Sequence, residues 1–350
     1  MENLSVSQHR GLLDFDSLDD VPECRADDIL IRVVYAELNP VDLQKLSIRK
    51  GQAVTDSPLV VGYGGSGIVQ DVGSNISKDW KDKRVAFLCD PSRPGSYATH
   101  VLVDQRLVAP IPFPLTLKEA ATVPLAGCTA YESLLKLGLG NDMPLRGRDP
   151  TLLVVGGAGG VGSWTIQLAR VLYPNLKIIA TASSEPSGLW CQRMGANQVI
   201  KHDEIALQLQ GGREGSVDYI LCLAEPMPAL FGALSEVIRP YGSICLVVAG
   251  ESIKSLDLSL IFFKAATVTT QTVFSSIRTN FEYIQPAVEI EDLLQHVAAR
   301  NAIIAPLSPQ LGSLAGAEDW KLCLQEGGIL DKLASGHAIG KLVMKIGSEE

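Results

Sequence analysis

A run of glycines at residues 157–162 has the type and spacing needed to hold a phosphate anion. It reads Gly157-Ala158-Gly159-Gly160-Val161-Gly162 and follows the apolar run 151–155 directly. Apolar residues then recur at helical spacing, so the pattern predicts a strand, a tight turn and a helix. In such a turn Gly157 permits the sharp bend, Gly159 lets a pyrophosphate approach the backbone, and Gly162 lets the helix pack on the strand. The sequence predicts a dinucleotide site here, with the anion at the helix amino terminus. A purely structural glycine turn is the alternative.

A second stretch fits the same template without the same context. It reads Gly62-Tyr63-Gly64-Gly65-Ser66-Gly67 and follows the apolar residues 59–61. The next residues, 68–72, have strand character rather than a helical period, so we interpret this motif as a bulge or tight bend in a β module.

The end of the second expected strand of the nucleotide domain bears on which cofactor binds. An acid that receives the adenosine ribose hydroxyls is expected about twenty residues beyond the glycine motif. This chain has Ala182-Ser183-Ser184 there instead. Without a carboxylate to repel it, a ribose phosphate can be accommodated, and Ser183, Ser184, Lys201 and His202 are candidate contacts. This favours NADPH over NADH, whereas the alternative role for Lys201 and His202 is a solvated strand end.

The elements that position these residues fall into two patterns. Residues 28–110 alternate short β-rich runs with turns, which predicts an all-β module. From about residue 127, strands alternate with helical periods, as in a parallel sheet covered by helices on both faces. We expect strands of that sheet at 151–155, 177–182, 198–200, 217–222, 243–248 and 266–270. The predicted fold class is therefore α/β.

Composition excludes several classes of protein. The 350 residues carry 30 Lys+Arg against 39 Asp+Glu, a net charge of −9, which disfavours nucleic acid as a partner. No apolar run reaches the roughly 18 residues that cross a bilayer, so no membrane partner is expected. The amino terminus lacks the features of a secretory signal, and the 7 scattered cysteines are typical of reduced core residues. We expect a cytoplasmic protein.

Taken together, six segments make the chain resemble the medium-chain dehydrogenase/reductase superfamily: 38–42, 62–67, 125–131, the Gly157 motif, 194–196 and 335–343. The resemblance implies a GroES-like, mostly-β catalytic domain formed by residues 1–126 and 274–350. It implies a Rossmann dinucleotide-binding domain, a doubly wound parallel sheet, at 127–273, with the active site in the cleft. It is similar to the branch of zinc-independent quinone oxidoreductases and enoyl reductases, and it implies a homodimer formed along the edge strand 266–270.

The positions that bind zinc in the alcohol dehydrogenases of this superfamily have lost their ligands here. Asn39 matches a Cys, Tyr63-Gly64 match a His-Glu pair, and Leu125 matches a further Cys or His. Asn, Tyr and Leu do not assemble the nitrogen and sulfur tetrahedron that zinc prefers. We therefore expect no metal.

Without a Lewis acid, the chemistry favours reduction of an electron-poor acceptor, whose developing oxyanion needs hydrogen-bond donors. Tyr63 offers a hydroxyl, Asn39 an amide and Lys45 a charge. The alternative for Asn39 and Asp42 is a helix cap with Pro40 at the first helical position, and for Tyr63 a half-buried strand aromatic with its hydroxyl in water. Gly64, where related reductases often carry Asp, suggests a wider or less polar acceptor pocket.

The resemblance also implies contacts with the nicotinamide end of the cofactor. Thr129 aligns with a position that contacts the nicotinamide, and a helix-start threonine is its alternative role. Backbone around Val248, Gly250, Val273 and Phe274 is implied for the carboxamide.

The sequence thus predicts an NADPH-dependent, zinc-independent oxidoreductase that reduces a quinone or an α,β-unsaturated carbonyl as its small-molecule substrate. Two alternatives remain open. One is an enoyl reductase of a biosynthetic pathway with a carrier-bound substrate, and the other is a non-catalytic NADPH-binding sensor or scaffold.

Overall fold

The structure is a computed structural model that describes residues 3–9, 12–18, 23–49, 59–139, 149–209, 215–224, 229–247, 251–279, 285–300 and 303–349. The chain divides into two compact units. Unit 1 combines Met1–Cys128 with Phe274–Glu350, and unit 2 is Thr129–Val273. Each unit is described on its own below.

Unit 2 is built on a six-stranded parallel sheet with the strand order β11-β10-β9-β12-β13-β14. The strands are β9 (Thr151–Val155), β10 (Lys177–Thr181), β11 (Gln198–Ile200), β12 (Val217–Cys222), β13 (Ile238–Leu246) and β14 (Thr267–Thr270). Numbered within the unit, this order is 3-2-1-4-5-6, the Rossmann arrangement, whose topological switch point lies between the first and fourth strands. Here those two strands are β9 and β12.

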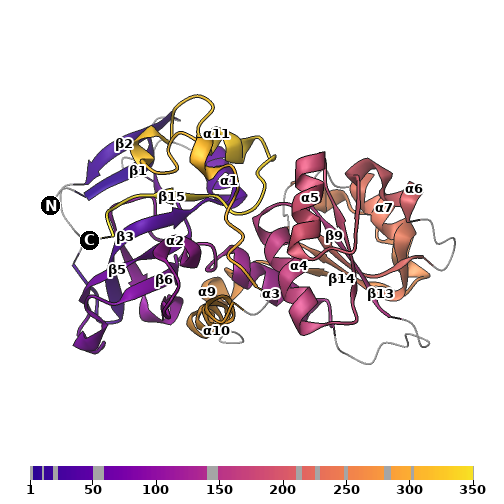
Figure 1. Cartoon of the computed structure of the whole chain (residues 1–350), viewed down its shortest axis with the longest axis horizontal. Helices are drawn as coiled ribbons and strands as arrows, with labels where there is room; N and C mark the ends of the chain where they lie inside the picture. The colour runs from indigo at the N-terminus through magenta and orange to yellow at the C-terminus, as the bar shows by residue number, and fades with distance from the viewer. Residues whose placement is uncertain are drawn as a thin grey trace. The chain divides into compact units, whose positions relative to one another are not determined.

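Helices cover both faces of this sheet, as Figure 1 shows for α4 and α5 against α6 and α7. The helices of unit 2 are α4 (Gly160–Leu172), α5 (Glu185–Met194), α6 (Ile205–Gln208), α7 (Ala229–Val237) and α8 (Ser259–Phe262). Leu153 and Val155 of β9 share one buried cluster with Phe231 of α7, whereas α4 packs on β9 and β10. Because successive strand residues point to opposite faces, β9 is buried on both sides.

Unit 1 is mostly β. Its larger sheet has the order β15-β3-β5-β6-β8, and β7 also pairs with β3; a second sheet has the order β2-β1-β4. The strands are β1 (Asn3–His9), β2 (Leu12–Leu18), β3 (Asp28–Glu37), β4 (Leu59–Val60), β5 (Gly64–Val72), β6 (Arg84–Leu88), β7 (His100–Asp104), β8 (Val108–Pro110) and β15 (Val343–Lys345). All pairings of the larger sheet are antiparallel.

The described part of unit 1 also contains helices. They are α1 (Pro40–Arg49), α2 (Leu117–Ala120), α9 (Ser275–Thr279), α10 (Pro286–Ala298) and α11 (Ile329–Ala334), while α3 (Ala126–Lys136) runs across the boundary between the units. α10 packs against β6 and β8 through Ile290, Leu293 and Leu294, which are buried. α1 begins directly where β3 has ended, so the residues between these two elements are held by both.

The first glycine motif bends the β module, as the sequence predicted. Gly62 has φ +96°, a backbone conformation that suits glycine, and the strand β5 then begins at Gly64. The register of β3 against β5 shifts between Val33 and Tyr35, opposite Gly67 and Ser66. The interpretation as a bulge is confirmed. Both parts of the predicted fold class, the parallel α/β sheet and the mostly-β domain, are also confirmed.

Among the described residues, no helix is both long and apolar enough to cross a membrane.

Candidate functional site

The second glycine motif forms the turn from β9 into α4, at the carboxyl end of the parallel sheet. A Cβ on Gly162 would lie 2.5 Å from the Gly156 carbonyl oxygen, and one on Gly157 would lie 2.7 Å from the Ala180 Cβ, so both positions require glycine. A Cβ on Gly159 would meet only the Gly156 oxygen at 3.6 Å. The backbone at Gly159 is therefore open to a close approach, as a pyrophosphate requires.

The sharp bend falls one residue earlier than the sequence pattern suggests. Gly156 has φ +86°, whereas Gly157 packs against the neighbouring strand β10. Gly159 is the residue before the first turn of α4 and supplies no side-chain cap. An uncapped helix start leaves backbone N–H groups of the first turn for an anion, so the loop fits a dinucleotide phosphate. Ala158, Gly160 and Val161 complete this loop.

A hydrogen-bonded chain connects the glycine turn with the end of β11. The Gly156 N–H donates to Thr181 Oγ1 over 2.9 Å, and Thr181 Oγ1 lies 2.6 Å from Nδ1 of His202. Since the hydroxyl already accepts from Gly156, its proton is available for Nδ1, which leaves Nε2–H of His202 as a donor. Burial lowers the pKa of His202, opposed by the charge of Asp203. The imidazole is therefore held neutral beside the loop.

The other residues predicted to contact a ribose phosphate lie at the same edge of the sheet with different partners. Ser184 is the cap residue of α5, where its hydroxyl accepts from the Ser187 N–H. Ser183 is exposed. Lys201 Nζ pairs with Glu204 at 3.1 Å, with 68% of the Lys201 side chain exposed. Their assignment to the cofactor stays a prediction.

In unit 1 the residues between β3 and α1 form a buried polar cluster. The Asn39 N–H donates to Asp42 Oδ2 over 2.7 Å, and the Tyr97 hydroxyl donates to the same oxygen over 2.8 Å. Asp42 therefore serves the helix start by accepting the backbone N–H of Asn39, as in one half of a capping box. Asp42 Oδ1 and Asn39 Nδ2 are buried and have no hydrogen-bond partner among the described residues.

The protonation state of Asp42 is set by its surroundings. Burial raises the pKa of Asp42 to about 7, although the hydrogen bonds from Asn39 and Tyr97 and the charge of Lys341 pull it down. Because Oδ2 already accepts two hydrogen bonds, the added proton belongs on Oδ1. Below neutral pH the cluster thus presents two unpartnered donors, the Asp42 Oδ1–H and the Asn39 Nδ2–H. Two such donors can stabilise a developing oxyanion.

Tyr63 is buried, with 2% of its surface exposed, and its ring packs edge-to-face against Phe274 at a centroid distance of 5.2 Å. The interpretation as a half-buried aromatic with its hydroxyl in water is therefore wrong. Burial raises the pKa of Tyr63, and the charge of Asp42 raises it further. The phenol stays a neutral donor, and negative charge on Asp42 acts on it directly.

The loop after β6 fixes this cluster from behind. The Ser96 N–H donates to the Gly62 oxygen, the Tyr97 N–H to the Val61 oxygen and the Ser96 hydroxyl to the Gly64 oxygen, at 2.9 to 3.0 Å. These bonds hold the segment of Tyr63 against the loop that carries Tyr97.

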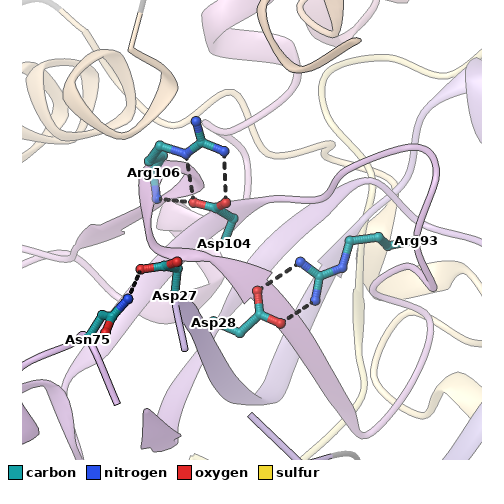
Figure 2. Close-up of polar contacts among 6 residues, drawn as sticks. All are labelled: Asp27, Asp28, Asn75, Arg93, Asp104 and Arg106. Atoms are coloured by element: carbon teal, nitrogen blue, oxygen red, sulfur yellow. Dashed lines mark hydrogen bonds and ion pairs between the residues drawn. The ribbon is translucent and has the colours of Figure 1, made fainter. Parts of the chain in front are cut away.

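Figure 2 shows how the loop itself is anchored. Arg93 reaches Asp28 at the start of β3 with two parallel bonds of 2.9 and 2.7 Å, and Asp104 binds Arg106 nearby. Asp27 accepts from the Asn75 amide at 3.0 Å. Of these, the Arg93–Asp28 pair is the one that connects the Tyr97 loop to the sheet.

The remaining predicted residues belong to other segments or to the helix α1 itself. Lys45 lies within α1. Thr129 is buried on α3, where its backbone oxygen accepts from Ser133. Val273 is buried after β14, and Val248 and Gly250 lie outside the described residues.

Sequence reasoning missed Glu37, Tyr97 and Lys341. Glu37 and Lys341 are both buried, and Lys341 Nζ lies 2.9 Å from Glu37 Oε2. A carboxylate in the apolar strand 29–38 and a lysine in the apolar segment 339–344 are the available signals, because charged side chains are rarely buried without a partner. The Gly64 expectation also changes: a Cβ there would lie 2.2 Å from Glu37 Oε1, so a carboxylate fills the space that Gly64 leaves.

Within the described part of the chain, no group of three or more His, Cys, Asp or Glu side chains is placed to hold a metal ion.

Comparison with known proteins places the chain in a family. Residues 25–113 match the alcohol dehydrogenase GroES-like domain. A zinc-type alcohol dehydrogenase-like protein of Staphylococcus aureus strain MSSA476 is 30% identical over 93% of this chain and 92% of its own. The protein belongs to the medium-chain dehydrogenase/reductase superfamily.

Two further relatives carry more specific names. The NADPH-dependent alkenal/one oxidoreductase of Arabidopsis thaliana chloroplasts is 38% identical over 52% of this chain and 47% of its own. The quinone oxidoreductase structure from Coxiella burnetii has a TM-score of 0.75 at 22% identity, covering 99% of this chain and 100% of that one. The first match covers about half of each chain, and the second supports the fold. Together these matches identify an oxidoreductase of the medium-chain type.

Proposed function

We propose that this protein is an NADPH-dependent reductase of α,β-unsaturated carbonyls or quinones that works without zinc. Bound NADPH supplies a hydride to the electrophilic carbon of the acceptor. The acceptor oxygen then gains negative charge and, with one proton from the protein or water, the reduced product is complete. The protein's own residues bind the cofactor and stabilise that charge.

The turn from β9 to α4 is the proposed phosphate site. Gly159 leaves the backbone open, while Gly157 and Gly162 have no room for a side chain. Thr181 connects the turn to His202 through hydrogen bonds to the Gly156 N–H and to His202 Nδ1. This tautomer of His202 carries its proton on Nε2, which can donate to a phosphate. The absence of a carboxylate at residues 182–184 and the name of the Arabidopsis relative support NADPH over NADH.

One observation carries the proposed chemistry: at the buried start of α1, Asn39 Nδ2 and Asp42 Oδ1 have no hydrogen-bond partner among the described residues, although buried polar atoms are normally hydrogen-bonded. Donors kept unpaired in a buried position are suited to a charge that exists only during reaction. Tyr63 belongs to the same unit, and burial keeps its hydroxyl neutral by raising its pKa.

Zinc independence is proposed from the same positions. Asn39, Tyr63 and Leu125 stand where zinc ligands are expected, and Leu125 uses its backbone N–H to bind Glu37. These side chains do not supply the ligands that zinc prefers. The word zinc in the name of the Staphylococcus relative therefore does not carry over to this chain in our proposal.

The proposal is tested by following NADPH absorbance with a panel of enones and quinones, with NADH in parallel and with a chelator present. We expect oxidation of NADPH, slower oxidation of NADH and no effect of the chelator. Activity that the chelator abolishes would refute zinc independence. NADPH binding without oxidation by any free acceptor would refute the proposed substrate class and favour a carrier-bound acceptor or a non-catalytic role.

We also propose a homodimer formed along β14. This strand ends the sheet of unit 2, and among the described residues it pairs only with β13. Leu258, Leu260, Phe262 and Phe263 precede it and are exposed, Phe263 by 97%. An edge strand beside exposed apolar side chains favours pairing with a second copy. Light scattering should give twice the chain mass, and Phe263→Asp should shift the protein toward the monomer; a monomeric wild type would refute the dimer.

A further inference from the structure

Lys341 is a buried lysine whose ammonium lies against three oxygen atoms of one small region. Only 3% of its side chain is exposed. Its Nζ lies 2.9 Å from Glu37 Oε2 and 2.8 Å from the Leu38 carbonyl oxygen, and it donates a short hydrogen bond to Asn39 Oδ1. An ammonium only donates, so its two hydrogen bonds go to the Leu38 and Asn39 oxygens, while Glu37 supplies the opposite charge.

This arrangement determines which way the Asn39 amide faces. A group that only donates must meet the oxygen of a side-chain amide, because an NH2 group cannot accept. Asn39 Oδ1 therefore faces Lys341, and Nδ2 is the atom that has no partner in the part of the chain that the structure describes. A flipped amide would place two donors against the ammonium.

Glu37 in turn fixes Lys341. Its Oε1 accepts the Leu125 N–H at 2.7 Å, and its side chain is fully buried. The carboxylate occupies the space beside Gly64, where any Cβ would approach Oε1 to 2.2 Å. Backbone bonds hold the other partner, since the Lys341 N–H donates to the Pro306 oxygen and its carbonyl accepts from Ser308. Neither member of the pair is a loosely held surface charge.

We propose that Lys341, held by Glu37, is a positioning residue that keeps the Asn39 amide turned so that its Nδ2–H donates to the oxyanion of the reduced acceptor. This inference rests on the proposed reductase function. It gives a role to the buried ion pair of Glu37 and Lys341.

The kinetic test uses a double-mutant cycle. Lys341→Met alone leaves a buried unpaired carboxylate and is expected to unfold the protein, so Glu37→Gln is combined with it. We expect this pair of changes to lower kcat/KM for the acceptor about tenfold, with the KM for NADPH unchanged, and Asn39→Ala to lower it about a hundredfold. When Glu37→Gln and Lys341→Met are added to Asn39→Ala, kcat/KM should fall no further, because the two residues act only through the Asn39 amide.

Lys345→Met is the matched control, a lysine four residues further along the chain at the end of β15, and should leave kcat/KM unchanged. Equal activity of wild type and the Glu37→Gln/Lys341→Met variant would overturn the proposal. So would a full additional loss in the Asn39→Ala background, since that would show a structural effect.

A second measurement does not depend on turnover. In protein labelled with 15N asparagine, the side-chain amide signal of Asn39 is the one that Asn39→Ala removes. We expect the Glu37→Gln/Lys341→Met variant to shift this signal and to speed its exchange with water, and Lys345→Met to leave it in place. An unchanged signal overturns the positioning role even if no acceptor is found, whereas a shifted signal in a protein that reduces nothing supports the positioning and refutes the reductase function alone.

Discussion

Replacing Asp42 by Asn should remove a pH dependence from the reaction while keeping the activity. In the wild type, Oδ2 accepts from the Asn39 N–H and the Tyr97 hydroxyl, so the proton that defines the neutral acid is carried by Oδ1. In Asp42→Asn, the amide oxygen must face the same two donors, and the NH2 group takes the place of Oδ1. The variant thus imitates the protonated acid at every pH.

The size of the effect follows from the pKa of about 7. The acid is roughly 90% protonated at about pH 6 and roughly 10% at about pH 8. If only the neutral form stabilises the oxyanion, kcat/KM falls about tenfold over that range in the wild type. Ionised Asp42 would also repel the developing charge, as its effect on the Tyr63 pKa shows.

Stability should follow the same titration. The folded-state pKa lies above that of an unfolded Asp, so this carboxyl stabilises the fold at low pH and its contribution is lost as the pH rises through about 7. Between about pH 6 and about pH 8 the loss is about 1 to 2 kcal/mol in the free energy of unfolding. Asp42→Asn should lack this slope.

The assay is kcat/KM for one enone from about pH 5.5 to about pH 8.5 at saturating NADPH, together with urea unfolding at the two ends. Tyr97→Phe provides a check of sign: it removes a hydrogen bond that lowers the Asp42 pKa, so the fall in activity should move to higher pH. The reasoning is refuted if Asp42→Asn keeps the fall in activity at the wild-type pH, or if Tyr97→Phe moves it to lower pH.

Three further predictions concern the loops around the site. Gly159→Ala should weaken NADPH binding and leave the melting temperature unchanged, because its Cβ would meet only one atom, at 3.6 Å. Gly162→Ala should lower the melting temperature, because its Cβ would lie 2.5 Å from a carbonyl oxygen. Equal melting temperatures of the two variants would contradict this prediction. Arg93→Ala leaves the buried Asp28 unpaired and should reduce the free energy of unfolding by about 3 kcal/mol in urea, with Arg106→Ala, at an exposed pair, changing it by less than about 1 kcal/mol. Lys201→Ala should raise the Kd of NADPH but not of NADH in a fluorescence titration, and an equal rise for both would exclude a contact with the ribose phosphate.

The parallel sheet could be predicted closely from the sequence because its strands are mostly short runs of apolar or β-branched residues. β9, β11 and β12 have the predicted bounds, and β10 and β14 differ by one residue. β13 begins at Ile238, ahead of the expected residue 243, and passes Tyr241 at φ +64°. The pairing of the amino-terminal strands β1 and β2 was not predicted, although Leu4 and Val6 alternate with polar residues as in a strand.

The candidate site divides in the same way. The glycine turn is local, so spacing alone places Gly157, Gly159 and Gly162 in a strand–turn–helix unit. Asn39 and Asp42 were also visible as a helix start, and the structure shows that Asp42 accepts the Asn39 N–H while it also binds Tyr97. A helix-start role and a catalytic role are thus compatible in one carboxylate, because each oxygen atom serves one of them.

What spacing could not show is the contact between opposite ends of the chain. Glu37 is the last residue of the mostly apolar strand β3 and Lys341 lies in an apolar segment, so each alone is interpreted as a charge at the edge of the core. The pairing becomes necessary only when both side chains are buried. Burying a single unpaired charge costs roughly several kcal/mol of folding free energy, and an opposite charge beside it offsets much of that cost. Gly64 then has a physical reason that no local turn supplies: it is the residue that leaves room for the Glu37 carboxylate. A charged residue in an apolar strand is therefore a sequence signal for an oppositely charged partner elsewhere in this unit. Here that partner is Lys341, which also donates to Asn39 Oδ1.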